Sequence, residues 1–452
     1  MKAINPATEE VIREYTEYNA SAVRDLLAQA ERAFRDWRRT PFARRTELLK
    51  QAATLLRRDV NQHARLMTEE MGKPIVESEA EVHKCAWVCE YFADHAERFL
   101  AAETIPTDAT HSFVRYDPLG PVLAVMPWNF PYWQVFRFAA PAIMAGNVGM
   151  LKHASNVPGC ALAIERVFRD AGAPEGVFTT LLVPSRAVPD LIKSPVIRAV
   201  TLTGSEPAGA AVAAQAGAAL KKTVLELGGS DPFVVLADAD PEAAAESAAL
   251  ARTINSGQSC IAAKRFIVEH SIAERFEYAL ADRLAGLKIG DPLDRATRVG
   301  PLARSDLVDE LHDQVQRSLR AGAKLLTGGH RLERKGYFYA PTVLVGVEPG
   351  MPVFDEETFG PVAAVIRARD TDHAIELANR SDFGLGASLW TADAERGQAL
   401  ASEIEAGAVF VNGIVKSDPR LPFGGIKRSG YGRELSAFGI REFVNVKTVW
   451  SK

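Results

Sequence analysis

Short apolar runs alternate with helical segments through most of this chain, and this alternation limits the folds that it can adopt. Residues 122–126 read VLAVM, and similar runs follow at 148–152, 178–183, 197–203 and 222–227. The stretches between them carry apolar residues at the three- and four-residue spacing of helices. A strand that is apolar at every position is buried on both faces, as in a parallel sheet covered by helices. The pattern predicts an α/β fold of strand–helix–strand units.

The same alternation occurs a second time after residue 231. Helices are expected at 272–284, 305–321 and 372–379, among strand-like runs at 233–236, 266–268, 343–345, 362–367, 387–390 and 408–411. The two blocks join near residues 228–231 without a flexible linker. A chain of 452 residues is long enough for two or three domains, so each block is expected to form its own sheet.

Helices and one exposed strand precede the first block. Residues 21–66 and 77–100 carry apolar residues at helical spacing, which predicts long amphipathic helices. Residues 111–116 alternate polar and apolar side chains, which is typical of a strand with one face in water.

Composition excludes several classes of function. Asp and Glu number 57 and Lys and Arg 53, so the formal net charge of −4 favours neither nucleic acid nor an anionic membrane as a partner. The opening MKAINPATEE lacks the apolar core of a secretory signal. Four cysteines in 452 residues do not make a disulfide framework. We therefore expect a cytoplasmic protein with reduced thiols.

Three of the four cysteines have no setting that suggests chemistry. Cys85 and Cys89 lie four residues apart on a predicted helix, and His83 and His95 are near them in sequence. Zinc needs four converging ligands, and this spacing is not that of a zinc ribbon, so no metal site is expected. Cys160 begins another amphipathic helix. Packing is the expected role of all three, because a buried thiol behaves as a small apolar group.

Cys260 differs, because it ends the small, polar stretch NSGQSC at residues 255–260. Backbone of this kind can approach a ligand closely and leave N–H groups free. A lone cysteine in a cytosolic enzyme is a candidate nucleophile, but it needs a base and an oxyanion donor to act. The cysteine alone is therefore a weak indication of function.

Other polar groups lie where predicted strands end. Gly204 and Ser205 follow a strand and open a helix, which either seats a phosphate on the helix N-terminus or makes only a tight turn. Glu226 ends a strand before a Gly-Gly pair, where its carboxylate can enter a cleft or meet solvent. Asn129 lies in the loop PWNFP, where its amide can donate to a developing oxyanion or hold the turn.

Taken together, the motifs resemble those of the aldehyde dehydrogenase superfamily. The likeness spans nearly the whole chain and keeps the family's order: NPAT at 5–8, PWNFP at 127–131, LK at 151–152, TGS at 203–205, ELGG at 226–229, GQSC at 257–260, EETFGP at 356–361 and PFGGIKRSGYGRE at 422–434. Each motif is weak alone, but eight in register leave little room for chance.

The resemblance implies a catalytic set. Cys260 would attack the aldehyde carbon as a thiolate, and the amide of Asn129 with the backbone N–H of Cys260 would hold the oxyanion. Hydride would pass to a nicotinamide cofactor and leave a thioester, which Glu226 would hydrolyse by activating water.

The resemblance also implies where the cofactor binds. Ser155 stands where many NAD-preferring relatives carry a glutamate that holds ribose hydroxyls. Its neutral side chain does not repel a 2′-phosphate, and Lys152 can pair with that phosphate. We expect NADP to be preferred and NAD to be accepted as well. Further cofactor contacts are expected from Trp128, Gly204, Ser205, Leu227 and Glu357.

Within the superfamily, the segments KHASN, PYWQVFRF and SGQSCIAAKRF resemble bacterial succinate-semialdehyde dehydrogenases of the NADP type. Arg137 matches an arginine that binds the substrate carboxylate, and Ser417 is expected to assist it. Trp133 is expected to line the aldehyde channel or to pack. Ile254 stands where some relatives carry a second arginine, which makes the substrate less certain than the reaction.

The implied architecture has two Rossmann-like parallel-sheet domains and a small β element. Residues 1–101 and 119–228 are expected to bind the cofactor, and residues 229–435 to form the catalytic domain. Residues 102–118 and 436–452 are expected to bridge subunits, because an exposed strand edge invites pairing. A dimer or a tetramer is the expected state.

Three alternatives remain open at this stage. The chain can be a dehydrogenase for another small aldehyde, such as glutarate semialdehyde, glycolaldehyde or an aliphatic aldehyde. It can be an acylating dehydrogenase that transfers the thioester to coenzyme A, although a water-activating Glu226 argues against this. It can also be a non-catalytic structural protein on the same fold, although Cys260, Glu226 and Asn129 together argue against that.

Overall fold

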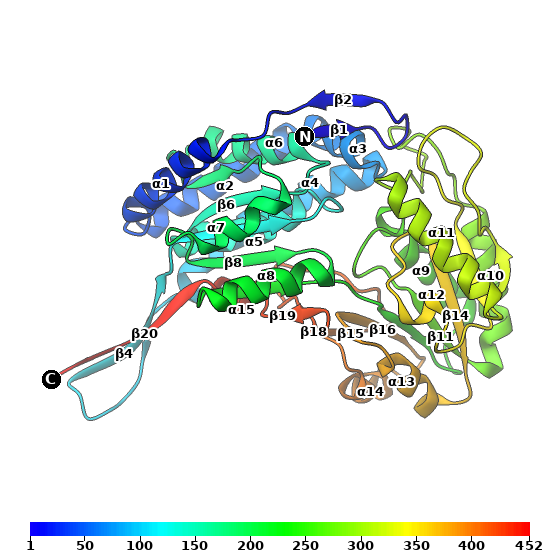
Figure 1. Ribbon diagram of the computed structural model, residues 1–452. Helices are drawn as coiled ribbons and strands as arrows, with labels where there is room; N and C mark the ends of the chain where they lie inside the picture. Colours follow the sequence, from blue (N-terminus) through cyan, green and yellow to red (C-terminus); the bar gives the residue numbers. More distant parts are fainter.

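The first sheet forms from the apolar runs that predict strands. The computed structural model describes residues 1–452, and its first sheet has the order β19-β9-β8-β5-β6-β7 (Figure 1). The strands β5 to β9 are parallel to one another. They span β5 (Pro121–Met126), β6 (Val148–His153), β7 (Phe178–Thr180), β8 (Ala199–Thr203) and β9 (Lys222–Glu226). β7 and β8 are shorter than predicted, and the other three match closely.

The helical N-terminal region consists of separate helices rather than one long stretch. Pro41 and Asp59 interrupt it, and each stands at the N-cap of the helix that follows. The helices of this half of the chain are α1 (Ala20–Trp37), α2 (Phe42–Arg58), α3 (Val60–Met71), α4 (Ile75–Phe99), α5 (Trp133–Ala145), α6 (Pro158–Asp170), α7 (Val188–Lys193) and α8 (Glu206–Ala218). The short hairpin β1 (Lys2–Ile4) and β2 (Val11–Glu14) precedes them.

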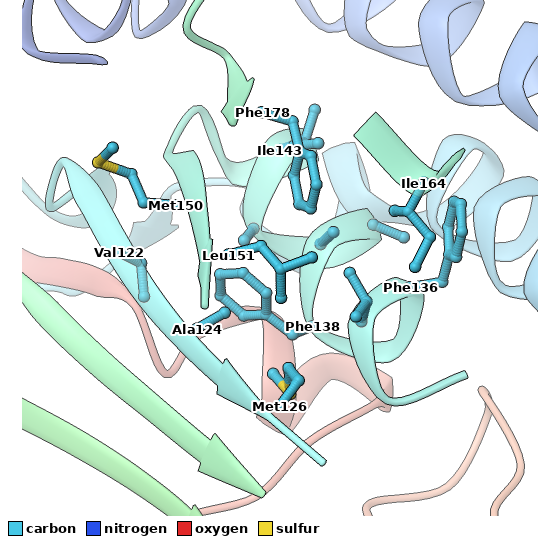
Figure 2. Close-up of a cluster of buried hydrophobic side chains, with 14 of the residues drawn as sticks. Val122, Ala124, Met126, Phe136, Phe138, Ile143, Met150, Leu151, Ile164 and Phe178 are labelled. Atoms are coloured by element: carbon cyan, nitrogen blue, oxygen red, sulfur yellow. The ribbon is translucent and has the colours of Figure 1, made fainter. Parts of the chain in front are cut away.

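The core of this domain is built around α5, whose thirteen residues are all buried. Figure 2 shows Phe138 of this helix among side chains of β5 and β6, and Phe136 beside Ile164 of α6. The ring of Phe136 stacks on Phe168 of α6 with 5.2 Å between centroids. Because α5 directly follows the PWNFP loop, the packing of this helix also fixes where that loop lies.

The second sheet has seven strands in the order β12-β13-β14-β11-β10-β16-β17. Its six predicted strands are β10 (Pro232–Val235), β11 (Arg265–Glu269), β13 (Thr342–Val345), β14 (Val362–Ala368), β16 (Gly386–Trp390) and β17 (Ala408–Val411). β12 (Lys324–Thr327) was not predicted and adds an antiparallel edge. The main helices here are α9 (Pro241–Thr253), α10 (His270–Ala285), α11 (Ser305–Arg320), α13 (Thr371–Asn379) and α14 (Ala394–Leu400).

An arm of antiparallel strands projects from the first domain (Figure 1). β20 (Val444–Ser451) pairs with β4 (His111–Pro118) along its whole length, and the short β3 (Glu103–Thr104) lies on the other side of β4. The predicted strands in the segments 102–118 and 436–452 therefore meet in one small sheet. Val446 and Trp450 of β20 are largely exposed on it.

The C-terminal segment returns to the first domain before the expected boundary at residue 435. β19 (Gly430–Tyr431) pairs antiparallel with β9, and α15 (Ser436–Ile440) packs against α4 and α5. Just ahead of it, β18 (Ile426–Lys427) pairs with β15 (Phe383–Gly384) near the second sheet. The PFGGIKRSGYGRE segment thus connects the two domains. No helix of the structure combines the length and the apolar content needed to cross a membrane.

The buried position of Phe136 gives a test of this core. Phe136→Ala is expected to lower the free energy of unfolding by about 3–5 kcal/mol, because it removes an aromatic ring from a closed interior. The exposed Tyr278 of α10 supplies the matched control, and Tyr278→Ala is expected to change stability by less than about 0.5 kcal/mol. Urea unfolding of both variants measures the difference. Equal midpoints would contradict the packing described here.

Candidate active site

The nucleophile-bearing turn lies between the two domains and has an uncommon backbone. Asn255, Ser256 and Gly257 have φ values of 54°, 55° and 80°, which place three successive residues in the left-handed region. Glu77 of α4 accepts the backbone N–H of Asn255 at 2.6 Å. A Cβ at Gly257 would lie 2.3 Å from the carbonyl carbon of Gly360, so only glycine fits there. Contacts from both domains therefore hold this turn.

A buried lysine organises the residues that follow the turn. The ammonium of Lys264 donates to the carbonyl oxygens of Ser259, Cys260 and Ala262 at 3.0, 2.9 and 3.1 Å. The same ammonium lies 3.7 Å from the carboxylate of Glu357. These bonds satisfy a fully buried cation and place a positive charge beside the nucleophile. Sequence patterning missed Lys264, which lies outside the eight motifs.

Cys260 is the only one of the four cysteines that is not fully buried. Burial of its thiol raises the pKa to about 12, although the charges of Lys264 and Arg137 act in the opposite direction. The thiol is therefore protonated at neutral pH in the free enzyme. Because the thiolate is the nucleophile, a base must accept this proton when a substrate is attacked.

Asn129 lies against the same turn, as its predicted role requires. Its side-chain amide donates to the carbonyl oxygen of Gln258 at 3.1 Å, which leaves a second N–H on the same nitrogen. The amide of Asn255 donates in return to the carbonyl oxygen of Asn129 at 2.7 Å. The carboxylate of Glu81 accepts the backbone N–H groups of Tyr132 and Trp133, both at 2.9 Å, and so anchors the end of the Asn129 loop.

Glu226 is buried rather than projecting into open solvent. Neither of its carboxylate oxygens has a hydrogen-bond partner. Burial raises its pKa well above the ordinary value, and the neighbouring Glu434 raises it further, while Arg137 opposes both effects. In its ionised form this carboxylate can accept a proton on either free oxygen, and the raised pKa makes it a stronger base than an ordinary glutamate.

A cavity of about 660 Å³ opens beside Cys260. The three predicted substrate residues, Trp133, Arg137 and Ser417, all line it, so the structure brings them together with the nucleophile. Arg137 is buried and forms an ion pair with Glu434, and its guanidinium lies 4.6 Å from the centre of the Phe423 ring. Its charge is therefore already compensated inside the protein.

Lys84 of α4 also lines this cavity and was not among the predicted site residues. Its ammonium donates to the hydroxyl of Ser417 at 2.8 Å and lies 4.2 Å from the centre of the Trp133 ring. The signal in the sequence was weak, because Glu77, Glu81 and Lys84 look like the polar face of an amphipathic helix. Their spacing nevertheless places all three on one side of α4.

The predicted cofactor residues gather at the ends of the first-sheet strands. Ser205 is the N-cap of α8, and no side chain caps the helix there, so its first N–H groups remain available to phosphate. A Cβ at Gly209 would lie 2.5 Å from a methyl carbon of Leu227, which brings α8 close to the loop after β9. A Cβ at Gly204 would meet only a methyl carbon of Leu202, at 3.6 Å. This arrangement fits a dinucleotide.

Lys152 and Glu357 lie at different parts of that site. The ammonium of Lys152 is buried, has no carboxylate partner and donates to the hydroxyl of Ser185 at 3.3 Å. Ser155 is exposed just after β6. Because its side chain is neutral, it adds no negative charge near Lys152. Glu357 accepts the backbone N–H of Gly229 at 3.0 Å.

Trp128, the remaining predicted cofactor residue, is half-buried in the Asn129 loop. Its ring meets Phe359 edge to face with 5.7 Å between centroids, and the guanidinium of Arg304 lies 5.8 Å from its centre. The loop is thus held against the EETFGP segment of the second domain. The predicted catalytic and cofactor residues consequently surround one region between the domains.

Comparison with known proteins agrees with this arrangement. The family model described as Aldehyde dehydrogenase family matches residues 1–449. The chain belongs to the aldehyde dehydrogenase family. The match to this aldehyde dehydrogenase thus includes the GQSC motif, the strands of both sheets and the C-terminal connecting segment.

Individual relatives of this aldehyde dehydrogenase align over nearly their full length. A Synechocystis protein named probable succinate-semialdehyde dehydrogenase [NADP(+)] is 54% identical over 99% of this chain and 98% of its own length. An Escherichia coli succinate semialdehyde dehydrogenase [NAD(P)+] is 50% identical, with coverages of 99% and 97%. The crystal structure of succinic semialdehyde dehydrogenase from Streptococcus pyogenes in complex with NADP+ has a TM-score of 0.97 at 38% identity, with coverages of 99% and 99%.

The raised pKa of Cys260 predicts how the free enzyme reacts with iodoacetamide. Below a pKa of about 12 the thiolate fraction grows about tenfold per pH unit, so the inactivation rate should rise log-linearly from pH 7 to 9. Mass spectrometry should find one label, since Cys85, Cys89 and Cys160 are buried. Cys260→Ser serves as the unlabelled control. A plateau below pH 8 would show that the thiol is already ionised.

Proposed function

We propose that this enzyme oxidises succinate semialdehyde to succinate with NADP+ as the preferred cofactor and NAD+ as an accepted one. The observation that carries the proposal is the cavity beside Cys260, which places Lys84, Arg137 and Ser417 within reach of one small substrate. These groups supply the positive charge and the hydroxyl that bind a carboxylate. The names of the relatives agree with this assignment.

In the first half of the proposed reaction, the sulfur of Cys260 bonds to the aldehyde carbon. The thiol proton leaves to a base, and Glu226 is the candidate because its carboxyl oxygens are free and its pKa is raised. The amide of Asn129 and the backbone N–H of Cys260 stabilise the oxygen that becomes negative. The bound cofactor supplies the acceptor for the hydride that leaves the same carbon.

Before the second half, Glu226 releases the thiol proton to solvent. It then removes a proton from water as that water attacks the thioester carbon. The carbon–sulfur bond breaks, succinate leaves and Cys260 takes back a proton from Glu226. Glu434 and Arg137 form an ion pair beside Glu226, so they set the charge that this base experiences. A base placed to hydrolyse the thioester argues against transfer to coenzyme A, and the intact catalytic set argues against a structural role.

The choice of cofactor rests on the surroundings of Lys152. Its ammonium is buried, and burial alone lowers its pKa, with no acidic side chain acting in the opposite direction. A 2′-phosphate can supply the missing negative charge, and the neutral Ser155 does not repel that group. Lys152 with Ser185 therefore favours NADP+ over NAD+.

We also propose that the arm joins two or more copies of the chain. The ribbon of β4 and β20 has exposed edges and exposed apolar side chains, which are stabilised when another subunit covers them. Light scattering of the purified enzyme is expected to give at least twice the monomer mass of 49.1 kDa. A monomer at micromolar concentration would contradict the bridging role. Placement in the cytoplasm stays a prediction from the sequence.

Initial rates test the substrate and the cofactor together. kcat/KM for succinate semialdehyde is expected to exceed that for butanal, which has four carbons and no carboxylate, by at least about tenfold, because a charge-assisted contact is lost. NADP+ is expected to give a higher kcat/KM than NAD+. Similar values for both aldehydes would favour a dehydrogenase for uncharged aldehydes and overturn the substrate assignment.

A single substitution separates the cofactor assignment from the substrate assignment. Ser155→Glu is expected to lower kcat/KM for NADP+ by at least about tenfold and to spare NAD+, because a carboxylate beside Lys152 repels the 2′-phosphate. Ser155→Ala is the matched control, since it removes the hydroxyl without adding charge. A loss of activity that is equal for both cofactors would contradict the proposed position of the phosphate.

A further inference from the structure

Three charged residues, Glu77, Glu81 and Lys84, lie on the side of α4 that faces the active site. The two glutamates bind partners inside the protein, whereas Lys84 forms no ion pair. Glu77 accepts the backbone N–H of Asn255, and Glu81 pairs with Lys73 and accepts two N–H groups at the start of α5. Lys84 lies one turn beyond Glu81, in the wall of the cavity that contains Cys260. Its ammonium forms no ion pair within the protein and donates only to the hydroxyl of Ser417.

The other basic side chains of the cavity differ from Lys84 in this respect. Arg137 pairs with Glu434, and Arg283 lies 3.1 Å from Glu246. Arg298 and Lys416 form no ion pair, but both side chains are exposed. Lys84 is thus the one cation of this cavity that is half-buried, free of a carboxylate partner and already placed beside a second hydrogen-bonding group.

We infer that Lys84, together with Ser417, receives the distal carboxylate of the substrate and sets the preference of this enzyme for an acidic aldehyde. The inference rests on the proposed function and identifies the group that selects its substrate. A carboxylate between Lys84 and Ser417 gains one ionic partner and one hydroxyl donor, while the Trp133 ring covers the ammonium.

The pairing of Arg137 with Glu434 gives this arginine a second role beside its place in the cavity wall. Its guanidinium also lies 3.5 Å from the hydroxyl of Thr203, and its charge acts to lower the pKa of both Glu226 and Glu434. Part of its charge is therefore used to hold the buried acids, whereas the charge of Lys84 is not shared with a carboxylate. The position of the second arginine of some relatives is Ile254, which lies in the same cavity wall and carries no charge. Lys84 supplies a cation there from another helix.

The surroundings of Lys84 agree with a binding site for an anion. Burial, together with the charge of Arg137, lowers the pKa of Lys84 to about 8, while Cys85, Glu81 and Asp418 act in the opposite direction. Below pH 8 the ammonium is charged and attracts a carboxylate. Above pH 8 the free enzyme loses this charge, so kcat/KM for the acidic aldehyde should fall there more steeply than kcat/KM for butanal.

The decisive measurement compares the two aldehydes in charge variants of Lys84. Lys84→Met keeps the length of the side chain and removes the charge. The ratio of kcat/KM for succinate semialdehyde to that for butanal is expected to fall about 10- to 100-fold in this variant, mainly through KM. Lys84→Arg should restore much of the ratio and move its alkaline decline to higher pH, because a guanidinium stays charged.

Lys416→Met provides the matched control, because Lys416 lines the same cavity but is exposed. It is expected to keep the ratio within about twofold, in line with the weak effect of exposed charges. If Lys84→Met lowers kcat/KM for both aldehydes equally, Lys84 is only structural and the inference fails. If the wild-type enzyme itself shows no preference for succinate semialdehyde, the proposed function fails, whatever Lys84 does.

Discussion

Two carboxylates on α4, the half-buried Glu77 and the buried Glu81, hold the loops of the candidate active site in place. Glu77 accepts a backbone N–H from the turn that carries the nucleophile, and Glu81 accepts two from the start of α5 behind the Asn129 loop. Backbone N–H groups buried without a partner are costly, so these bonds allow irregular backbone to persist in the interior. The ion pair between Glu81 and Lys73 keeps the second carboxylate in position. The distance between Asn129 and Cys260 therefore depends on one rigid helix.

Charged groups in the interior are stabilised by partners close to them. Lys264 is held by three carbonyl oxygens, and Arg137 is paired with Glu434. Glu226 is the exception, because both of its oxygens lack partners and its pKa is raised. Uncompensated buried groups are expensive and are therefore concentrated where chemistry needs them. The ammonium groups of Lys84 and Lys152 also lack an ionic partner in the protein. In the proposed function, the carboxylate of the substrate and the phosphate of the cofactor supply these partners.

Most of the predicted strands are buried on both faces, which leaves a continuous apolar run in the sequence, and this run is why the structure confirmed them. The edge strand β17 is only half-buried but keeps the same apolar run. β12 escaped prediction because it is an edge strand of mixed polarity, and β19 because two residues carry no periodic signal. The breaks at Pro41 and Asp59 divide a helical stretch whose apolar spacing continues across them. The order of the motifs predicted the family, which the match over residues 1–449 confirmed.

The candidate nucleophile Cys260, the candidate oxyanion donor Asn129 and the candidate base Glu226 were predicted from local motifs, because short stretches of backbone around them must have particular residues to adopt their shapes. The partners of charged side chains do not follow from local pattern. Helical spacing shows that Glu81 and Lys84 lie on one polar face of a helix. It cannot show that α5 and residue 417, which is 333 positions from Lys84, cover that face. Arg137 likewise meets Glu434 only because the C-terminal segment returns to the first sheet through β19. Long-range packing thus decided which cations are neutralised and which remain free for a ligand.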